Sequence, residues 1–302
     1  MKSAAIFYFT GTGNTQEVLA MIKSAFYAEG IKTDCLRIDH CTISNNTLGV
    51  ANYDAIGIGY PILAYNAPET VERFLMTLPP SDGKRAFIFK TSGEPFFING
   101  ASSFGISRIL KKKGYVLNYE RHFIMPYNIF FRYPDAVVKQ LYTLAERLSI
   151  KLAQDIADGV SDPPEFNPIV VLVSLIMRIQ RPLAKLNGRM YGTDAACNLC
   201  RKCVRECRVG NIRLDAGKIK FGWKCMMCMR CVMYCPQGAL KAGLINVMAL
   251  RGPYDFKRIT EDPDVCGEAI QDCNKGFFKF FKKYVKEMEE LTSGSASNDS
   301  CK

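Results

Sequence analysis

The chain has 302 residues, a mass of 33.9 kDa and a formal net charge of +11, and this length exceeds one small domain. Because 48% of the residues are hydrophobic, the chain can bury a sizeable core, which excludes global disorder. The longest uninterrupted apolar run, residues 169–177, is much shorter than the ~20 residues of a membrane-spanning helix. We therefore expect no integral membrane segment. The N-terminal apolar stretch has the pattern of a strand and not of a secretory signal, so we expect a cytoplasmic protein.

The first 160 residues alternate between strand patterns and helical patterns. Short apolar runs typical of buried strands lie at residues 4–9, 31–38, 54–60, 86–90 and 115–125. Apolar residues at helical spacing follow the first run, at Val18, Leu19, Ile22 and Phe26, and a longer helical pattern covers residues 134–158. This alternation predicts an α/β fold, an open parallel sheet with helices on both faces. Ligands of such sheets bind beyond the carboxyl ends of the strands.

A loop rich in glycine and threonine, residues 10–15 (TGTGNT), joins the first strand to the first helix. It does not fit a dinucleotide fingerprint, because Gln16 stands where the third glycine is required, and it lacks the Gly-Lys of a Walker A loop. It matches the pattern [ST]-x-T-G-N-T, in which backbone amides at a helix N-terminus and hydroxyl groups hold a phosphate. The alternative is a turn that only caps the helix.

A polar, proline-rich stretch at residues 159–168 indicates a domain boundary. Residues 169–190 predict one helix that packs between two domains. The alternative for this helix is a membrane-surface role through four cations, Arg178, Arg181, Lys185 and Arg189.

Eight of the 13 cysteines lie between residues 197 and 235, in two sets with identical spacing. The first set is Cys197, Cys200, Cys203 and Cys207, and the second set is Cys225, Cys228, Cys231 and Cys235. The spacing C-x2-C-x2-C-x3-C, with Pro236 after the last cysteine, is the signature of bacterial [4Fe–4S] ferredoxins. An odd cysteine count disfavours a disulfide framework, and the third closely spaced cysteine of each set disfavours zinc.

In two-cluster ferredoxins, the fourth cysteine of each run binds the other cluster. The sequence therefore predicts one cluster on Cys197, Cys200, Cys203 and Cys235, and a second on Cys225, Cys228, Cys231 and Cys207. Arg208 follows Cys207 where ferredoxins usually have proline. The remaining cysteines are expected to be free thiols, namely Cys35, Cys41, Cys266, Cys273 and Cys301.

Positive charge is concentrated in the second half of the chain. Residues 166–302 hold 23 Lys and Arg against 13 Asp and Glu, whereas residues 1–165 hold 17 against 16. Each oxidised cluster with four thiolates carries about −2, so part of this charge compensates the clusters. We expect the remainder to dock an acidic redox protein. We expect no nucleic-acid binding, because the basic residues are not interleaved with aromatic residues.

Near the C-terminus, residues 274–291 predict a helix that docks on the protein through one aromatic and apolar face. That face carries Phe277, Phe281, Tyr284 and Met288. The alternative is that this helix binds a partner. Residues 293–302 are expected to form a disordered tail.

Residues 1–160 resemble a short-chain flavodoxin, and the cysteine repeat resembles a bacterial two-cluster ferredoxin. The chain is thus similar to the flavodoxin–ferredoxin fusion flavoproteins known as EFR-type "ferrodoxins". This resemblance implies a flavodoxin-like, doubly wound, five-stranded parallel sheet, followed by a small α+β two-cluster ferredoxin-like domain. We expect these domains at 1–160 and 191–245, a linker and connecting helix at 161–190, and an extension at 246–302.

The resemblance also implies which residues bind FMN. The phosphate would lie on Thr10, Gly11, Thr12, Gly13, Asn14 and Thr15. The isoalloxazine ring would lie between the segment with Tyr60, Pro61 and Tyr65 and the segment with Thr91, Ser92, Gly93 and Glu94. Tyr65 or Tyr60 is the candidate for stacking on the ring, and Asn128 is a further candidate for the pocket lining.

With FMN and two [4Fe–4S] clusters as cofactors, the expected function is electron transfer between flavin and clusters. The alternatives are an FMN-dependent reductase of a small organic substrate that is fed by the clusters, and a redox-sensing module. His40 and His122 are the only histidines, which argues against a hydrolytic triad.

Overall fold

Five parallel strands form the central sheet of the structure, a computed structural model that describes residues 1–41, 49–273 and 276–293. The strands are β1 (Ser3–Tyr8), β2 (Lys32–Arg37), β3 (Ala55–Pro61), β4 (Arg85–Ser92) and β5 (Val116–Ile124). Their order in the sheet is β2-β1-β3-β4-β5, and every neighbouring pair is parallel. This is the strand order of the flavodoxin-like fold, which confirms the predicted fold class.

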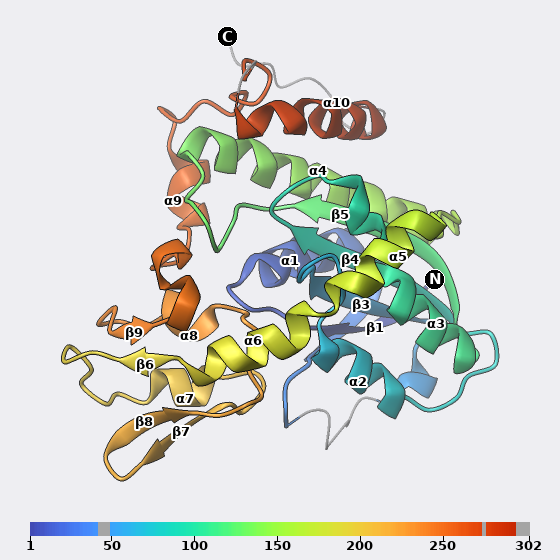
Figure 1. Cartoon of the computed structure of the whole chain (residues 1–302). Coiled ribbons are helices and arrows are strands. Elements are labelled where there is room, and N and C mark those ends of the chain that lie inside the picture. Colours follow the sequence, from blue (N-terminus) through green and yellow to red (C-terminus); the bar gives the residue numbers. More distant parts are fainter. Residues whose placement is uncertain (42–48, 274–275, 294–302) are drawn as a thin grey trace.

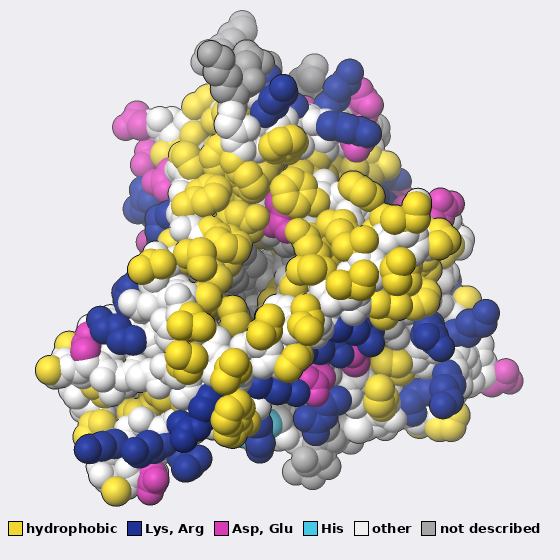
Figure 2. Space-filling view, in the orientation of Figure 1, with side chains coloured by type: hydrophobic (Ala, Val, Ile, Leu, Met, Phe, Trp, Pro, Cys, Tyr) yellow, Lys and Arg dark blue, Asp and Glu magenta, His cyan; other side chains and the backbone are white. Residues whose placement is uncertain are grey.

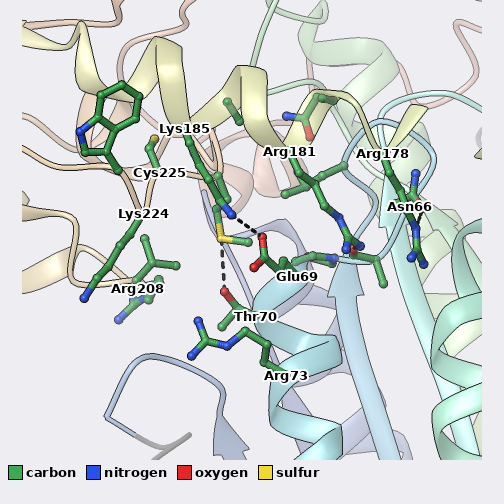
Figure 3. Close-up of a pocket in the computed structure, with 18 of the residues that line it drawn as sticks. Asn66, Glu69, Thr70, Arg73, Arg178, Arg181, Lys185, Arg208, Lys224 and Cys225 are labelled. Atoms are coloured by element: carbon green, nitrogen blue, oxygen red, sulfur yellow. Dashed lines mark hydrogen bonds and ion pairs between the residues drawn. The ribbon is translucent and has the colours of Figure 1, made fainter. Parts of the chain in front are cut away.

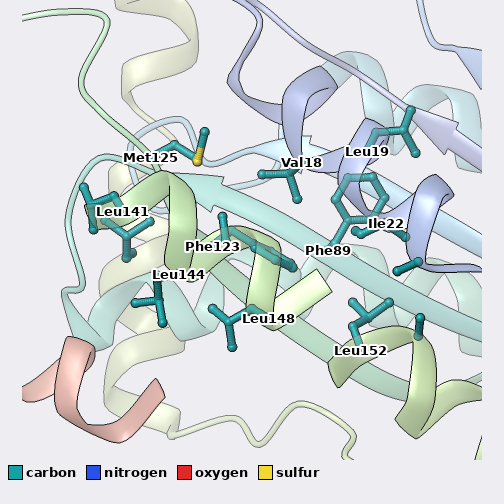
Figure 4. Close-up of a cluster of buried hydrophobic side chains, with 14 of the residues drawn as sticks. Val18, Leu19, Ile22, Phe89, Phe123, Met125, Leu141, Leu144, Leu148 and Leu152 are labelled. Carbon is teal, nitrogen blue, oxygen red and sulfur yellow. The ribbon is translucent and has the colours of Figure 1, made fainter. Parts of the chain in front are cut away.

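Helices cover both faces of the sheet (Figure 1). Helices α1 (Asn14–Ala28) and α4 (Asp135–Asp158) lie on one face, and α2 (Glu69–Thr77) and α3 (Phe104–Lys112) lie on the other. Because side chains alternate along a strand, Ala4 and Ile6 of β1 join the first core, whereas Ala5 and Phe7 join the second. Figure 4 shows the first core, in which α1 and α4 side chains meet Phe89.

Two glycines in β3 let aromatic rings lie across the sheet. A Cβ atom on Gly57 would overlap the ring of Phe87, and a Cβ atom on Gly59 would overlap the ring of Phe89. Both rings are buried against α1 and α4. The alternation of glycine with Ile56 and Ile58 therefore serves packing on the α1–α4 face.

The connecting segment forms two helices, α5 (Pro168–Met177) and α6 (Gln180–Arg189), so the expectation of a single helix is wrong. The reason is Pro182 in the first turn of α6. Proline has no amide hydrogen to donate to the carbonyl of Arg178, and its ring crowds that carbonyl. At the start of α5, Asn167 caps the helix by accepting a hydrogen bond from the Ile169 amide at 2.9 Å.

Helices α5 and α6 contact both parts of the chain, but most of their large apolar side chains face outward. Helix α5 packs on the 3₁₀ helix η2 (Phe97–Ser103), and α6 packs on the 3₁₀ helix η3 (Gly243–Met248). The outward side chains, which gather on the face seen in Figure 2, are Ile169, Leu172, Leu175, Ile176, Ile179, Leu183, Leu186 and Met190. Only a minority of the large apolar side chains of α5 and α6 therefore takes part in the expected packing between domains.

Three of the four cations in the segment of α5 and α6 pair with acidic side chains of α2, whereas Arg189 is exposed. Arg178 and Arg181 both pair with Glu72 of α2, at 3.0 and 2.8 Å, and Lys185 pairs with Glu69 at 3.0 Å. These pairs occupy three of the four cations that a membrane-surface role would require. Among the described residues, no helix has both the length and the apolar character needed to cross a membrane.

A small mixed unit follows α6. Strand β6 (Gly192–Thr193) pairs antiparallel with β9 (Leu240–Lys241), and β7 (Ile212–Asp215) forms a hairpin with β8 (Lys218–Phe221). Two short helices, α7 (Lys202–Glu206) and α8 (Arg230–Met233), lie within the two cysteine runs, each just before the last cysteine of its run. The core of this unit is small and includes five of the eight clustered cysteines as partly buried members. A domain with so small an apolar core needs stabilising interactions in addition to apolar packing.

The last segment returns to the first domain. Helices α9 (Phe256–Glu261) and α10 (Phe281–Thr292) pack on α4, and Phe281 and Val285 are fully buried there. This confirms a docked C-terminal helix, which begins at Phe281 after the 3₁₀ turn η4 (Phe277–Phe280). A further 3₁₀ turn, η1 (Val50–Asn52), precedes β3. The expected tail falls mainly on residues 294–302, and these residues, with Cys301, lie outside the described part of the chain.

Candidate functional site

A cavity of about 460 Å³ lies at the carboxyl edge of the sheet. It is lined by the segments that follow four strands, around Thr12 after β1, Tyr65 after β3, Gly93 after β4 and Asn128 after β5. The remaining wall comes from residues 227–229 of the cysteine-rich unit and from the α5–α6 junction. We call this cavity the sheet-edge pocket. Its place at the strand ends is where open α/β sheets bind ligands, and its volume is typical of cofactor sites.

The loop after β1 is fixed by hydrogen bonds to neighbouring loops. The Thr15 hydroxyl lies 2.8 Å from the Thr91 hydroxyl, and the Asn128 amide donates to the Thr12 hydroxyl at 2.6 Å. The Asn14 amide donates to a backbone carbonyl of the β5 loop at 2.7 Å. The amides of Asn14 and Thr15, the first two of α1, have no partner within the helix and remain available to an anion. Of the predicted loop residues, Thr10, Gly11, Thr12, Asn14 and Thr15 line the pocket.

Gly13 lies behind the loop and does not line the sheet-edge pocket. Its φ of 116° is in the region that favours glycine, and its carbonyl accepts the first backbone hydrogen bonds of α1. Gly11 has a different role. A Cβ atom on Gly11 would lie 2.6 Å from the carbonyl oxygen of Cys228, so the glycine permits direct contact with the cysteine-rich unit.

The loop after β3 makes a tight turn. Leu63 and Asn66 exchange two backbone hydrogen bonds, at 2.9 and 3.1 Å, and both central residues, Ala64 and Tyr65, have positive φ. Such backbone costs about 1 kcal/mol or more per non-glycine residue and persists where neighbours hold it. Ser174 of α5 is that neighbour, since its hydroxyl donates to the Tyr65 carbonyl at 3.0 Å. The turn directs Tyr65, together with Pro61, into the pocket lining.

Tyr60, the other candidate for ring stacking, is not in the pocket lining. It is fully buried in the core beneath α2 and α3. It shares this face with Ile56 and Ile58, because side chains two residues apart on a strand point the same way. That alternation is visible in the sequence and could have identified Tyr60 as a core residue.

The loop after β4 forms the opposite wall. Thr91, Ser92, Gly93 and Glu94 all line the pocket, as predicted. The Ser92 hydroxyl lies 2.9 Å from Nε2 of His122, and a Cβ atom on Gly93 would overlap the Tyr127 ring. Burial raises the pKa of the Glu94 carboxyl.

His122 gives the stability of the protein a predictable pH dependence. Burial, with a smaller contribution from the Lys90 charge, lowers the pKa of His122 to about 3. An unfolded histidine titrates near pH 6.5. Between about pH 6.5 and the lower pKa of the folded state, only the unfolded chain binds the proton, so the folded state loses stability as the pH is lowered. We expect His122→Gln to remove up to about 1.4 kcal/mol of this loss per pH unit. Thermal unfolding at pH 7 and pH 5 measures the difference, with His40→Gln, at the exposed histidine, as the control. Equal pH dependence of stability in wild type and His122→Gln would contradict this role of His122.

Several residues of the sheet-edge pocket were not predicted from the sequence. They are Phe96, Asn99, Pro126, Tyr127, Ile129, Phe130, Met177, Gln180, Met227, Cys228 and Met229. The last six come from the β5 loop, the connecting helices and the cysteine-rich unit. Apart from the cysteine motif that contains Cys228, they carry no motif, and only the tertiary structure brings them to the sheet edge.

The eight clustered cysteines line two small cavities. One is lined by Cys197, Cys200, Cys203 and Cys235, and the other by Cys207, Cys225, Cys228 and Cys231. This is the exchange of the fourth cysteine that the sequence predicts. Cys207 lies with the second set although Arg208 replaces the usual proline. No disulfide joins any of the twelve cysteines in the described part of the chain.

The two cysteine runs have the same backbone conformation. Leu199 and Arg201, on either side of Cys200, have φ of 57° and 58°, and Met227 and Met229, on either side of Cys228, have φ of 56° and 61°. Four non-glycine residues with positive φ at equivalent places indicate a required loop shape. Burial raises the pKa of Cys225 to about 12, so binding a group that needs thiolates must release protons.

Direct bonds join the cysteine-rich unit to the loop after β1. Arg230 of α8 donates to the Gly11 carbonyl at 2.9 Å, and the Tyr234 hydroxyl donates to the Thr12 carbonyl at 2.8 Å. Glu206 holds Arg230 in place through a contact of 2.7 Å with Nε. As a result, Cys228 lines both the sheet-edge pocket and the second cysteine cavity.

No protein-family model and no curated protein matches the sequence. Among solved structures, the chain is similar to a short-chain flavodoxin associated with a non-canonical PDU bacterial microcompartment, at 16% identity and a TM-score of 0.39, over 53% of this chain and 100% of that chain. It is similar to oxidised flavodoxin 2 from Bacillus cereus, at 14% identity and a TM-score of 0.40, over 52% and 99%. It is also similar to an NAD(P)H:quinone oxidoreductase from Methanothermobacter marburgensis, at 10% identity and a TM-score of 0.40, over 51% and 95%.

Proposed function

We propose that this protein is an electron-transfer flavoprotein that holds FMN in the sheet-edge pocket and a [4Fe–4S] cluster in each cysteine cavity. The main support for the proposal is that Cys228 lines both the sheet-edge pocket and the second cysteine cavity. Because electron transfer slows steeply with distance, a residue shared by two cofactor sites provides a short path. FMN supplies exchange of electron pairs or single electrons, and each cluster supplies exchange of one electron.

The residues of the sheet-edge pocket fit FMN. The hydroxyls of Thr12 and Thr15, with the N-terminus of α1, offer donors to a phosphate without any cationic side chain. The turn with Tyr65 and the segment with Gly93 form two walls between which a flat ring system fits. The methionines at 227 and 229 add apolar surface on the side of the cysteine-rich unit.

The two cysteine cavities fit a relay that ends at the surface. Cys225, Cys228 and Cys231 are partly buried, whereas Cys200 of the first set is exposed. Arg201 and Arg205, next to Cys200, are also exposed. We infer that electrons pass between FMN and the second cluster, then the first cluster, and reach an acidic redox protein that docks on these cations.

Phosphate binding can be tested by removing hydroxyls from the loop after β1. We expect Thr12→Val combined with Thr15→Val to weaken FMN binding by at least about tenfold, because two donors to a charged group are lost. Iron content should be unchanged, and wild-type protein should release FMN and not FAD on denaturation. Flavin fluorescence during equilibrium dialysis measures the affinity, and Thr33→Val on β2 is the control. Release of FAD, or unchanged affinity in the double variant, would exclude the loop as a phosphate site.

A flavin-dependent reductase of an organic substrate is the alternative function. The two functions differ in what happens to electrons placed on the flavin. In the reductase, they leave to a bound substrate without passing through Cys228. In the relay, they reach the clusters of the same molecule.

A further inference from the structure

A second cavity, of about 400 Å³, lies between the sheet domain and the cysteine-rich unit. Its walls come from α2, the α5–α6 junction and residues 223–226, so that both units and the connecting segment contribute. Figure 3 shows Arg208 and Lys224 on one side of the cavity, and Glu69, Thr70 and Arg73 on the other. We call this cavity the interdomain pocket.

Cations outnumber acids around the interdomain pocket. Its lining contains one carboxylate, Glu69, and six cations, Arg73, Arg178, Arg181, Lys185, Arg208 and Lys224. Arg178 and Arg181 both form ion pairs with the carboxylate of Glu72, and Lys185 forms an ion pair with Glu69. Among the residues that the structure describes, no carboxylate pairs with Arg73 or Lys224.

Arg208 provides a second, independent observation. Only 5% of this residue is exposed, and its Nε has no hydrogen-bond partner within the described part of the chain. Among the described residues, its guanidinium donates one hydrogen bond to a carboxylate, that of Glu206 at 3.4 Å, and Glu206 is bound more closely by Arg230. A buried donor without a partner lowers stability, so a guanidinium left partly unsatisfied in a cavity wall indicates a place for an acceptor.

We propose that the interdomain pocket binds a small anion with phosphate or carboxylate groups, held between Arg73 on α2 and Lys224 of the cysteine-rich unit. The volume exceeds what a single phosphate needs and is within the range of small-molecule sites. Guanidinium groups suit both anions, because their planar donors match two oxygens at once. Since the two cations belong to different units, the anion would also link the two units.

The interdomain pocket also adjoins the second cysteine cavity, because Cys225 lines both. One consequence of this rests on the proposed function. A reduced cluster carries one more negative charge than an oxidised cluster, so reduction would weaken anion binding. By reciprocity, the bound anion would favour the oxidised cluster.

Isothermal titration calorimetry on the fully loaded, oxidised protein tests the site, with pyrophosphate and citrate as separate probes. We expect one site per chain for at least one probe, and the probe that binds identifies the phosphate or carboxylate class. Arg73→Gln combined with Lys224→Gln should lower the affinity at least tenfold. Lys111→Gln combined with Lys112→Gln, at two exposed lysines of α3, should bind as wild type does. Absence of binding by both probes, or equal affinity in both double variants, overturns the proposal.

The same titration after reduction with dithionite separates this site from the proposed function. Weaker binding to the reduced protein supports a cluster beside the pocket. Binding that is lost in the Arg73 and Lys224 variant but is unchanged by reduction supports the anion site and contradicts the placement of a cluster on Cys225.

Discussion

Protein reconstituted under anaerobic conditions is expected to contain about eight iron and eight sulfide per chain, because eight thiols line two separate cavities and each suits one [4Fe–4S] cluster. Replacing one ligand in each cavity distinguishes the two sites. Cys228→Ser should remove mainly the second cluster and should also alter the flavin absorbance, since Cys228 lines the sheet-edge pocket. Cys200→Ser should remove mainly the first cluster and leave the flavin spectrum unchanged, because Cys200 lies outside that pocket.

Iron, acid-labile sulfide and flavin assays on the three proteins provide the measurement. A content near four iron, or stoichiometric zinc, would exclude two clusters. Loss of both clusters in both variants would mean that the cysteine-rich unit folds only when fully loaded. This is the behaviour of small domains whose core is completed by a metal group.

The second expected result is a relay within one molecule. After rapid anaerobic mixing with a reductant, electrons placed on the flavin should reach the clusters at a rate that is independent of protein concentration. The physical reason is the direct contact between the units, in which Arg230 and Tyr234 bond to the loop after β1. Stopped-flow absorbance of the flavin and of the clusters, at several protein concentrations, measures this rate.

Cys228→Ser and Cys200→Ser form a matched pair for the relay. Cys228→Ser should leave flavin reduction intact and slow the appearance of reduced cluster, whereas Cys200→Ser should still pass electrons to the second cluster. Transfer onward to an acidic redox protein should slow as salt rises, because exposed cations such as Arg201 guide docking. A cluster reduction rate that scales with protein concentration would contradict the relay. Turnover of an organic substrate unaffected by Cys228→Ser would favour a flavin reductase.

Local patterns in the sequence determined much of this protein. The alternation of apolar runs and helical periodicities predicted the parallel sheet, because both patterns depend on neighbouring residues alone. The loop at residues 10–15 and the two cysteine runs were also readable, since each places its groups within a few residues. The exchange of Cys207 and Cys235 between the runs followed from the resemblance to ferredoxins, and the structure groups them in that way.

The tertiary structure alone decided which parts meet. Gly11 and Arg230 are 219 positions apart in the sequence, and no local pattern indicates that they touch. The same holds for Cys228 in the wall of the sheet-edge pocket and for Arg73 opposite Lys224 in the interdomain pocket. Three cations of the α5–α6 segment, Arg178, Arg181 and Lys185, also turn inward, because Glu69 and Glu72 of α2 lie beneath them. Such contacts depend on how complete units pack together, and spacing along the chain carries no information about that packing.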